Sequence, residues 1–353
     1  MDERIALQHN EENEASGGIF RVREEGAPSR ILKVLRPPAA RAAGADTSPW
    51  HTSEAPDHYN YWRREVEAYR SGLAHSAYAE AGIRAPRLLS ADTQVDGSVE
   101  LWLEDVEGPS AFDWSVERLG RFGYELGVGQ GRWAGRVPPP AELPWLSRHW
   151  LAQYLTHGPG AQDGIDEAAW DSPAVQAWSA ETRGALRRLW HARTRLLPAA
   201  EDLPRTLCHL DLWPANLIED GSGTSVLIDW AFVGEGAIGE DPANLLVDSV
   251  TDGLMDIALL PDLVAAVTEG YVKGLADGGW AGSADEARTA IAVCASAKWG
   301  WLGAQVMAGA ARGHTGRSGY GQDDSAVEAL MRLTPLADQL ARWADEALRA
   351  AAV

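Results

Sequence analysis

The segment 207–230 constrains this chain more than any other, because it reads as two short strands inside a part of the sequence that is otherwise helical. It runs LCHLDLWPANLIEDGSGTSVLIDW. A glycine-containing turn at residues 220–223 separates two apolar runs and predicts a hairpin. Such a hairpin brings the loop before its first strand next to the end of its second strand. We therefore expect Asn216 and Asp229 to lie close together.

The residue types at these positions are those that bind a hard divalent cation. Magnesium takes oxygen ligands in octahedral geometry and usually keeps few protein ligands beside phosphate oxygens and water. The amide oxygen of Asn216 and the carboxylate of Asp229 meet that need. Asp211, five residues before Asn216, can instead face a substrate hydroxyl. The segment predicts one general base and one metal platform.

Two motifs in this segment resemble those of the aminoglycoside phosphotransferase and choline kinase family, which has a protein-kinase-like fold. Residues 209–216 match the catalytic-loop pattern of that family, which is His, any residue, Asp, four residues and Asn. Residues 228–230, Ile-Asp-Trp, match its metal-binding pattern. Many members have Gly where this chain has Leu210, so we expect that the loop cannot rely on a glycine conformation there. Ala231 likewise stands where many relatives carry an acid.

The resemblance implies a role for each polar residue of the two motifs. Asp211 would orient or deprotonate the acceptor hydroxyl, and Asn216 and Asp229 would hold Mg²⁺. His209 would brace the loop by hydrogen bonds. Asp241, which lies in an acidic run after the metal-binding motif, would help to fix the catalytic loop.

The first hundred residues predict a strand-rich region with one helix. The helix is expected at residues 59–73, where aromatic and aliphatic residues recur at helical spacing. Residues 36–57 are rich in Pro, Ala and Ser without periodicity, and they predict a loop or a mobile insertion. The expected strands, of which the first three form an antiparallel meander and the last two a hairpin, are residues 4–9, 19–22, 31–35, 88–91 and 99–106.

Lys33 is the lone charge in an apolar strand. The resemblance implies that it contacts the α and β phosphates of a nucleotide and pairs with a glutamate of the following helix. Glu65 is the preferred partner and Glu67 the alternative, because the two face different sides of a helix. The backbone amides of Gly17 and Gly18 are candidates to approach the phosphates, although the sequence there is not G-x-G-x-x-G and also suits a plain turn.

Residues 101–108 resemble the hinge between the two lobes of the same family. The resemblance implies that Leu103 walls the adenine pocket. It also implies that the carbonyl of Glu104 and the amide of Val106 bind the purine edge. An edge strand that simply ends at Gly108 is the alternative.

From Trp114 onward the apolar spacing is mainly helical. The expected fold class is α+β and protein-kinase-like, with a small antiparallel sheet lobe before a larger helical lobe. The expected division is a nucleotide-binding lobe at residues 1–107 and a catalytic and acceptor-binding lobe at residues 108–353. The expected helical segments are 114–133, 145–155, 174–196, 258–276, 285–309 and 325–350.

The acceptor pocket of this family is built from helices of the C-terminal lobe, whose sequences vary with substrate. Aromatic faces suit a sugar ring or a cation, although most of the 16 tryptophans are expected to pack in the core. Trp213 is the preferred wall residue because it lies between Asp211 and Asn216 in the sequence. The full set of candidate wall residues is Trp145, Trp150, Trp213, Trp299 and Trp301.

The formal charge of −20 repels nucleic acid and favours a cationic substrate, although an acidic surface also serves solubility alone. No apolar run approaches the length of a membrane span, and the N-terminus has acids where a secretory signal has bases. We therefore expect a cytoplasmic protein without a membrane partner. Cys208 and Cys294 lie in apolar runs and are expected to be buried thiols.

Together these features predict transfer of the γ-phosphoryl group of Mg²⁺-bound ATP or GTP to a hydroxyl group. The expected acceptor is an aminoglycoside or other antibiotic, an amino sugar or an amino alcohol, which includes a role in antibiotic resistance. One alternative is a kinase-like enzyme that phosphorylates Ser or Thr of a biosynthetic peptide. The other is a non-catalytic nucleotide-binding scaffold, which would have no need for Asp211.

Overall fold

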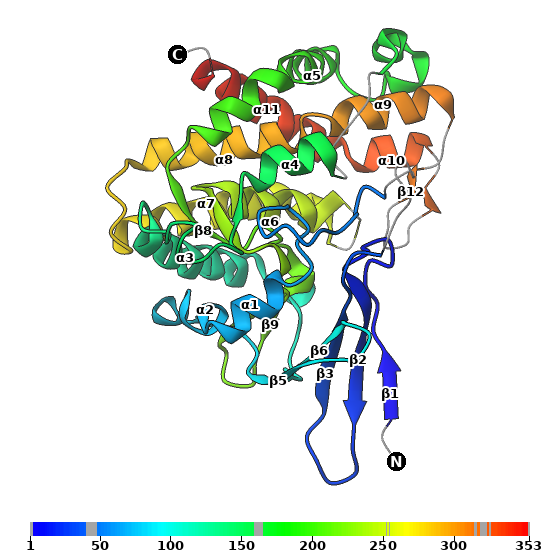
Figure 1. Cartoon of the computed structure of the whole chain (residues 1–353). Helices are drawn as coiled ribbons and strands as arrows, with labels where there is room; N and C mark the ends of the chain where they lie inside the picture. The colour runs from blue at the N-terminus through cyan, green and yellow to red at the C-terminus, as the bar shows by residue number, and fades with distance from the viewer. Residues whose placement is uncertain are drawn as a thin grey trace.

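The computed structural model describes residues 3–39, 48–158, 165–251, 253, 255–313, 316–317, 323–324 and 326–351. A strand-rich N-terminal region lies against a larger region in which helices stack in successive layers (Figure 1). The α+β class expected from the sequence is confirmed. The boundary between residues 107 and 108 stays a prediction. Among the described residues, no helix is both long and apolar enough to span a membrane.

The N-terminal region is built on a five-stranded antiparallel sheet in the order β1-β2-β3-β6-β5. Burial alternates along β6, as expected for a strand with one face on the core. Both the predicted meander and the predicted hairpin are present. The strands are β1 (Glu3–Ala6), β2 (Ser16–Arg23), β3 (Arg30–Leu35), β5 (Leu88–Thr93) and β6 (Val99–Glu104).

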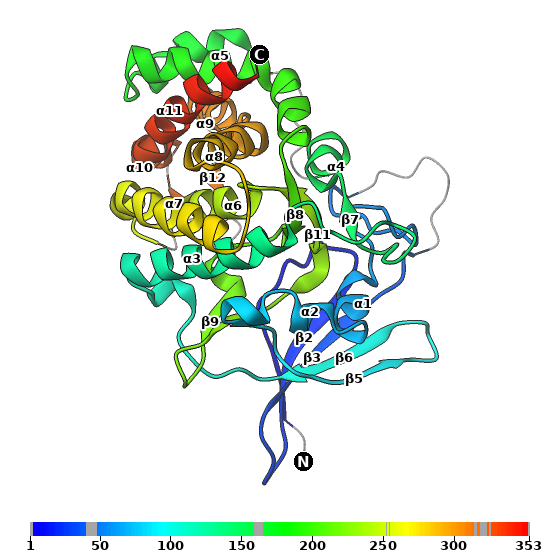
Figure 2. The same cartoon turned by 90° about the vertical axis from the view of Figure 1, so that its left-hand side faces the viewer.

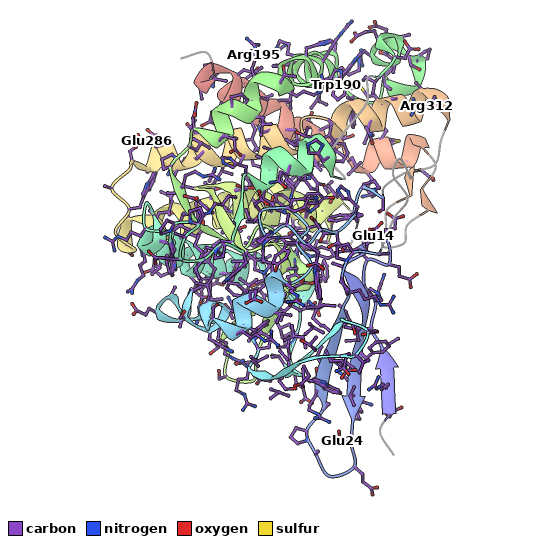
Figure 3. The ribbon with its side chains drawn as sticks, in the orientation of Figure 1. Glu14, Glu24, Trp190, Arg195, Glu286 and Arg312 are labelled. Atoms are coloured by element: carbon purple, nitrogen blue, oxygen red, sulfur yellow. The ribbon has the colours of Figure 1, made fainter. Side chains whose placement is uncertain are left out.

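One end of this sheet faces the helical region. Figure 3 shows Glu24 at the tip of the β2–β3 hairpin, which points away from the helices, and Glu14 near the opposite end. The amide of Glu14 donates to the Trp50 carbonyl at 3.3 Å, so the loop before β2 is tied to the segment that precedes α1. Residues 40–47 of the predicted insertion lie outside the described residues.

The single helix predicted at residues 59–73 is instead two short helices. They are α1 (Arg64–Arg70), which starts later than predicted, and α2 (Leu73–Ser76). The Asn60 side-chain amide donates to the Trp50 carbonyl at 2.9 Å, and the Asn60 carbonyl accepts from a neighbouring amide of the same segment. The Asn60 carbonyl, which the first helical turn would need as an acceptor, is therefore already hydrogen-bonded outside the helix.

The contact between α3 (Val116–Trp133) and α7 (Leu260–Asp277) is the closest helix pairing near the site. A Cβ added at Gly123 would lie 2.7 Å from the Val267 carbonyl oxygen, which is closer than any real Cβ approaches. The small residues let the two backbones touch, and only glycine fits there. The α3 glycines that face α7 in this way are Gly120, Gly123, Gly127 and Gly131.

Two predicted helical segments are each divided in two. Residues 285–309 form α8 (Ala284–Trp299) and α9 (Leu302–Arg312), which are separated at Gly300, a poor helix former. The described part of residues 325–350 forms α10 (Ala326–Arg332) and α11 (Thr334–Ala350). Pro335 lies in the first turn of α11, where proline is tolerated because it has no amide hydrogen to continue the hydrogen bonds of the first helix.

The remaining helices start later than predicted. Residues 147–148 form a strand, so α4 (Trp150–His157) begins after them. The helix α5 (Ala180–Glu201) begins at its cap, where the Ser179 side chain accepts from the Thr182 amide. The helix α6 (Glu240–Thr251) follows the strand at residues 234–237 and was not predicted as a helix.

Three small sheets accompany the helices. Figure 2 shows β8 and β11 below the upper helices and above the level of α1. The hairpin predicted within residues 216–230 is confirmed as β9 (Leu217–Glu219) and β10 (Ser225–Leu227). The strands that were not predicted are β4 (Ile83–Arg84), β7 (Ser147–Arg148), β8 (Arg205–Cys208), β11 (Gly234–Ala237), β12 (Gly316–Arg317) and β13 (Asp323–Asp324).

Candidate active site

The β9–β10 hairpin brings Asn216 and Asp229 together as its sequence indicates. The pairing of the strands continues one step further, because the Ile228 amide donates to the Asn216 carbonyl at 2.9 Å. The Asn216 side-chain amide donates to the backbone oxygen of Asp211 at 2.8 Å and to its carboxylate at 3.0 Å. Its own amide oxygen is thereby turned away from Asp211. The backbone pairing puts Asn216 opposite Ile228, the residue before Asp229. An amide oxygen and a carboxylate are a donor set that suits Mg²⁺.

Lys33 lies between two carboxylates. Its Nζ atom is 2.7 Å from Oε2 of Glu65 and 3.1 Å from Oδ1 of Asp229. The ion pair on α1 is therefore made by Glu65, while Glu67 is half-buried on another side of the helix. Burial alone would lower the pKa of Lys33, but Asp229 and Glu65 raise it above its ordinary value. The ammonium charge is retained inside the molecule.

Asp211 lies in the loop between β8 and β9. Burial raises the pKa of its carboxyl to about 7, and the charge of Asp229 acts in the same direction. Lys298 lowers it, which places this lysine of α8 within electrostatic reach of Asp211. A carboxyl with a pKa near neutrality can accept a proton from a hydroxyl during transfer.

Leu210 adopts the left-handed backbone conformation, with a φ of 67°. The expectation that the loop does without a glycine conformation at this position is wrong. A non-glycine residue in this region costs about 1–2 kcal/mol, and such a residue persists where its surroundings fix it. Here the Asp241 carboxylate accepts from the amides of His209 and Leu210 at 2.7 and 2.8 Å. The buried Leu210 side chain adds core packing.

Asp241 is itself oriented by a buried chain of hydrogen bonds. The Gln130 side-chain amide on α3 donates to Asp241 at 2.7 Å. The Tyr271 hydroxyl on α7 donates to the Gln130 oxygen at 2.5 Å. The glycine-lined contact between α3 and α7 therefore sets the position of the group that holds the catalytic loop.

His209 is fully buried and its Nε2 atom lies 2.9 Å from the Ile228 carbonyl oxygen. Burial lowers the pKa of His209 to about 4, so the ring is neutral near pH 7. A carbonyl can only accept, which means that Nε2 carries the proton. This bond joins the catalytic loop to the residue before Asp229, in keeping with a bracing role.

Arg64, which the sequence did not single out, fixes α1 relative to the metal-binding motif. Its buried guanidinium donates to the carbonyls of Ala231 at 3.3 Å and Trp145 at 2.8 Å. Burial lowers the pKa of Arg64 to about 9. Because Ala231 lies two residues after Asp229, these bonds set the position of Glu65 next to it. The other carbonyl partners of Arg64 are those of Pro56, His58 and Tyr59.

The two glycines proposed to approach phosphate lie inside β2 rather than in a loop. A β-bulge separates Ser16 from Gly18, and Gly18 has a φ of 124°, a conformation that favours glycine. A Cβ at Gly17 would lie 2.8 Å from the Val34 side chain. Their contact with a nucleotide stays a prediction.

The hinge residues lie at the end of β6. Leu103 is buried, and the carboxylate of Glu104 forms an ion pair with Arg84 at 3.1 Å. A cavity of about 480 Å³ adjoins this position and is lined by Glu104, Asp105 and Val106 together with the β9–β10 turn. Leu103, Lys33 and Asp229 do not line this cavity. The purine contacts of the hinge stay a prediction.

The structure separates the candidate wall residues by burial. Trp145, Trp150 and Trp299 are buried, whereas Trp213 and Trp301 are half-buried. The Trp213 ring meets that of Phe112 edge-on, with centroids 6.0 Å apart. Trp213 remains the best placed of the five because it belongs to the loop that carries Asp211.

The sequence analysis also missed Lys298, which is buried near the site. It is the lone charge in an apolar run of α8, residues 290–299. The same pattern drew attention to Lys33 in its strand, so the signal was present. The pattern does not say which helix packs on α6, so the sequence alone could not place Lys298 near the site.

Comparisons with known proteins found one matching family model and several similar solved structures. The model of the phosphotransferase enzyme family matches residues 19–282, which is more than half of the chain. No curated protein matched the sequence. Similar solved structures include an aminoglycoside phosphotransferase from Alicyclobacillus acidocaldarius, at 15% identity over 99% of this chain and 93% of that one, with a TM-score of 0.49.

Two further solved structures are an aminoglycoside-3'-phosphotransferase of type VIII and an aminoglycoside phosphotransferase from Streptomyces rimosus. The first is 20% identical over 81% of this chain and 93% of that one, with a TM-score of 0.45. The second is 16% identical over 84% and 93%, with a TM-score of 0.43.

Proposed function

Since the chain belongs to the phosphotransferase enzyme family, we propose that it transfers the γ-phosphoryl group of Mg²⁺-bound ATP or GTP to a hydroxyl group of a small molecule. The observation that carries the proposal is the convergence of Lys33, Glu65, Asp211, Asn216 and Asp229 on one place. They come from β3, α1 and the β8–β10 segment. Contacts of 3.1 Å or less nevertheless join Lys33 to Glu65 and Asp229, and Asp211 to Asn216.

Lys33 binds the α and β phosphates in this proposal. Its ammonium group is held between Glu65 and Asp229 before any nucleotide arrives, so little reorganisation is needed. The nucleotide base lies beside Leu103, Glu104 and Val106, which are at the end of β6 or follow it.

Asn216 and Asp229 hold the magnesium ion. When bound, the ion neutralises charge on the β and γ phosphates. Asn216 also donates to Asp211 at 3.0 Å, so one amide keeps the base and the metal platform at a fixed separation. Asp229 shares Lys33 with Glu65, which links the metal platform to the phosphate-binding lysine.

Asp211 aligns the acceptor hydroxyl and accepts its proton. Phosphoryl transfer gives the protein little covalent chemistry to perform, and catalysis rests on positioning and charge. The hydrogen bonds to Asp241 and Asn216 hold Asp211 and its loop in place.

The acceptor is proposed to be a hydroxyl-bearing small molecule with a cationic group. The net charge of −20 favours the approach of such a molecule. Asp248 on α6 lies within electrostatic reach of Asp211. Antibiotic resistance would follow where the acceptor is an antibiotic, and a cytoplasmic location belongs to the same proposal.

The test is Mg²⁺-dependent nucleotide turnover against a panel of aminoglycosides, other antibiotics, amino sugars, choline and Ser-containing peptides. We expect acceptor-stimulated turnover that falls by about 10² to 10³ in Asp211→Asn, with nucleotide affinity retained. Normal turnover in that variant would show that the base is wrongly assigned. Tight nucleotide binding without turnover on any acceptor would contradict the small-molecule proposal.

A further inference from the structure

Lys298 is a buried cation that the proposed reaction does not use. It is 6% exposed and sits at the end of α8. Its Nζ atom lies 4.4 Å from the ring centroid of Trp299, 5.0 Å from that of Trp150 and 5.3 Å from that of Tyr154. A buried ammonium group is costly unless it has partners, and aromatic faces partly supply them.

The hydrogen bond of Lys298 goes to a neutral amide. Its Nζ atom donates to Oδ1 of Asn244 at 2.9 Å, while the carboxylate of Asp248 is further away, at 3.9 Å. An ammonium group carries only donors, so Asn244 must turn its oxygen toward Lys298. The orientation of the Asn244 amide is therefore fixed by the lysine.

The other end of the same amide reaches the catalytic loop. The Asn244 Nδ2 atom donates to the Leu210 carbonyl at 3.3 Å. The Leu210 amide is already bound by Asp241 at 2.8 Å. Both polar groups of the left-handed residue are thus held from α6, by two side chains three residues apart.

We propose that Lys298 and Asn244 form a positioning pair. By holding the carbonyl of Leu210, the pair keeps the backbone of this residue in the left-handed conformation and so orients Asp211 toward the acceptor hydroxyl. Lys298 acts through Asn244 and does not touch the acceptor. The catalytic part of this inference rests on the proposed function, whereas the effect on the loop does not.

The first test measures the loop itself, without any acceptor. Lys298→Met keeps the aliphatic stem in the aromatic cage and removes the donor. We expect hydrogen–deuterium exchange in peptides covering residues 207–217 to become about tenfold faster, with the α3 peptides unchanged. The matched control is Lys273→Met, because Lys273 is an exposed lysine over the ring of Tyr124 at 5.4 Å, on a helix that does not carry the pair.

The second test measures turnover with the acceptor found in the panel above. A misplacement of about 1 Å costs on the order of a hundredfold in rate, so we expect Lys298→Met to lower kcat to that extent with the nucleotide KM within about twofold of the parent. Asn244→Ala should behave alike. Because the two residues act as one unit, the double variant should be no slower than either single variant.

The substitution Asn244→Asp distinguishes the hydrogen bond that Asn244 accepts from Lys298 from the one that it donates to Leu210. A carboxylate still accepts from Lys298, but it cannot donate to the Leu210 carbonyl. We expect it to be as slow as Asn244→Ala and to show the same faster exchange at residues 207–217. Full activity in Asn244→Asp would contradict the proposed bond to Leu210.

Two results would overturn the inference. One is unchanged exchange at residues 207–217 in Lys298→Met, together with a raised KM for the acceptor alone, which would make Lys298 an acceptor ligand. The other is strictly additive losses in the double variant. If the parent protein turns over no acceptor while Lys298→Met still loosens the loop, the positioning of the loop stands and the proposed function fails, with the catalytic part of the inference.

Discussion

Lys33 and Lys298 are both buried lysines, one in the N-terminal sheet and one in the helical region, and their partners differ in kind. Lys33 contacts two carboxylates, at 2.7 and 3.1 Å. Lys298 donates to a neutral amide at 2.9 Å and lies over three aromatic rings. A cation between carboxylates can exchange one of them for a phosphate without losing its compensation. The nearest partners of Lys298 are neutral, and its one carboxylate neighbour, Asp248, is at 3.9 Å. This arrangement suits a fixed positioning role.

The largest expected effect, on both turnover and stability, comes from replacing Lys33 in the N-terminal sheet. Lys33→Met should lower turnover by about 10² to 10³ and the free energy of unfolding by about 3 kcal/mol, because Glu65 is left buried without its partner. Steady-state kinetics and urea denaturation measure the two. The double variant Lys33→Met with Glu65→Gln should regain stability but not turnover. Recovered turnover would mean that Lys33 only neutralises Glu65.

A smaller loss of stability is expected when Lys298, the buried lysine of the helical region, is replaced. Lys298→Met should lower the free energy of unfolding by about 1–2 kcal/mol, since one hydrogen bond and the ring contacts are lost while the new side chain still fills the cage. The same urea denaturation measures it. A loss as large as that of Lys33→Met would show that Asp248, at 3.9 Å, is a true ion-pair partner.

The smallest expected effect is a difference in stability between two variants of Leu210, the residue on which Lys298 acts. Leu210→Ala and Leu210→Gly both remove a fully buried side chain and should each cost about 2–4 kcal/mol. Because the φ of Leu210 is 67°, the glycine variant should be more stable than the alanine variant by about 1 kcal/mol. This reverses the usual order for a core position. The usual order in the denaturation curves would mean that the left-handed backbone is not strained.

The chemistry-bearing residues that lie close in sequence were predictable. Asp211, Asn216 and Asp229 are brought together by a single local hairpin, whose glycine turn is visible in the sequence. Lys33 and Glu65 needed only one further step, from a strand to the next helix. The hairpin therefore predicted the proximity of Asp211, Asn216 and Asp229, whereas the pairing of Lys33 with Glu65 was implied by the resemblance to a known family.

The residues that support the site depend on contacts between distant segments. Gln130, Asn244 and Lys298 lie on α3, α6 and α8, and nothing in their local sequence says which helices meet. The conformation of Leu210 was mispredicted for the same reason. Asp241, 31 residues away, and Asn244, 34 residues away, fix a backbone that residue type alone disfavours.

The glycine-lined contact between α3 and α7 also bears on how the chain folds. Almost the whole catalytic segment lies between these two helices in sequence, from residue 133 to residue 260. Contacts between segments so far apart in sequence close a long loop, and such non-local contacts generally form slowly. Docking of α7 onto α3, which brings Tyr271 to Gln130, is therefore expected late in folding. A chain that ends before α7 would leave the glycine face of α3 uncovered and the catalytic loop without its innermost support.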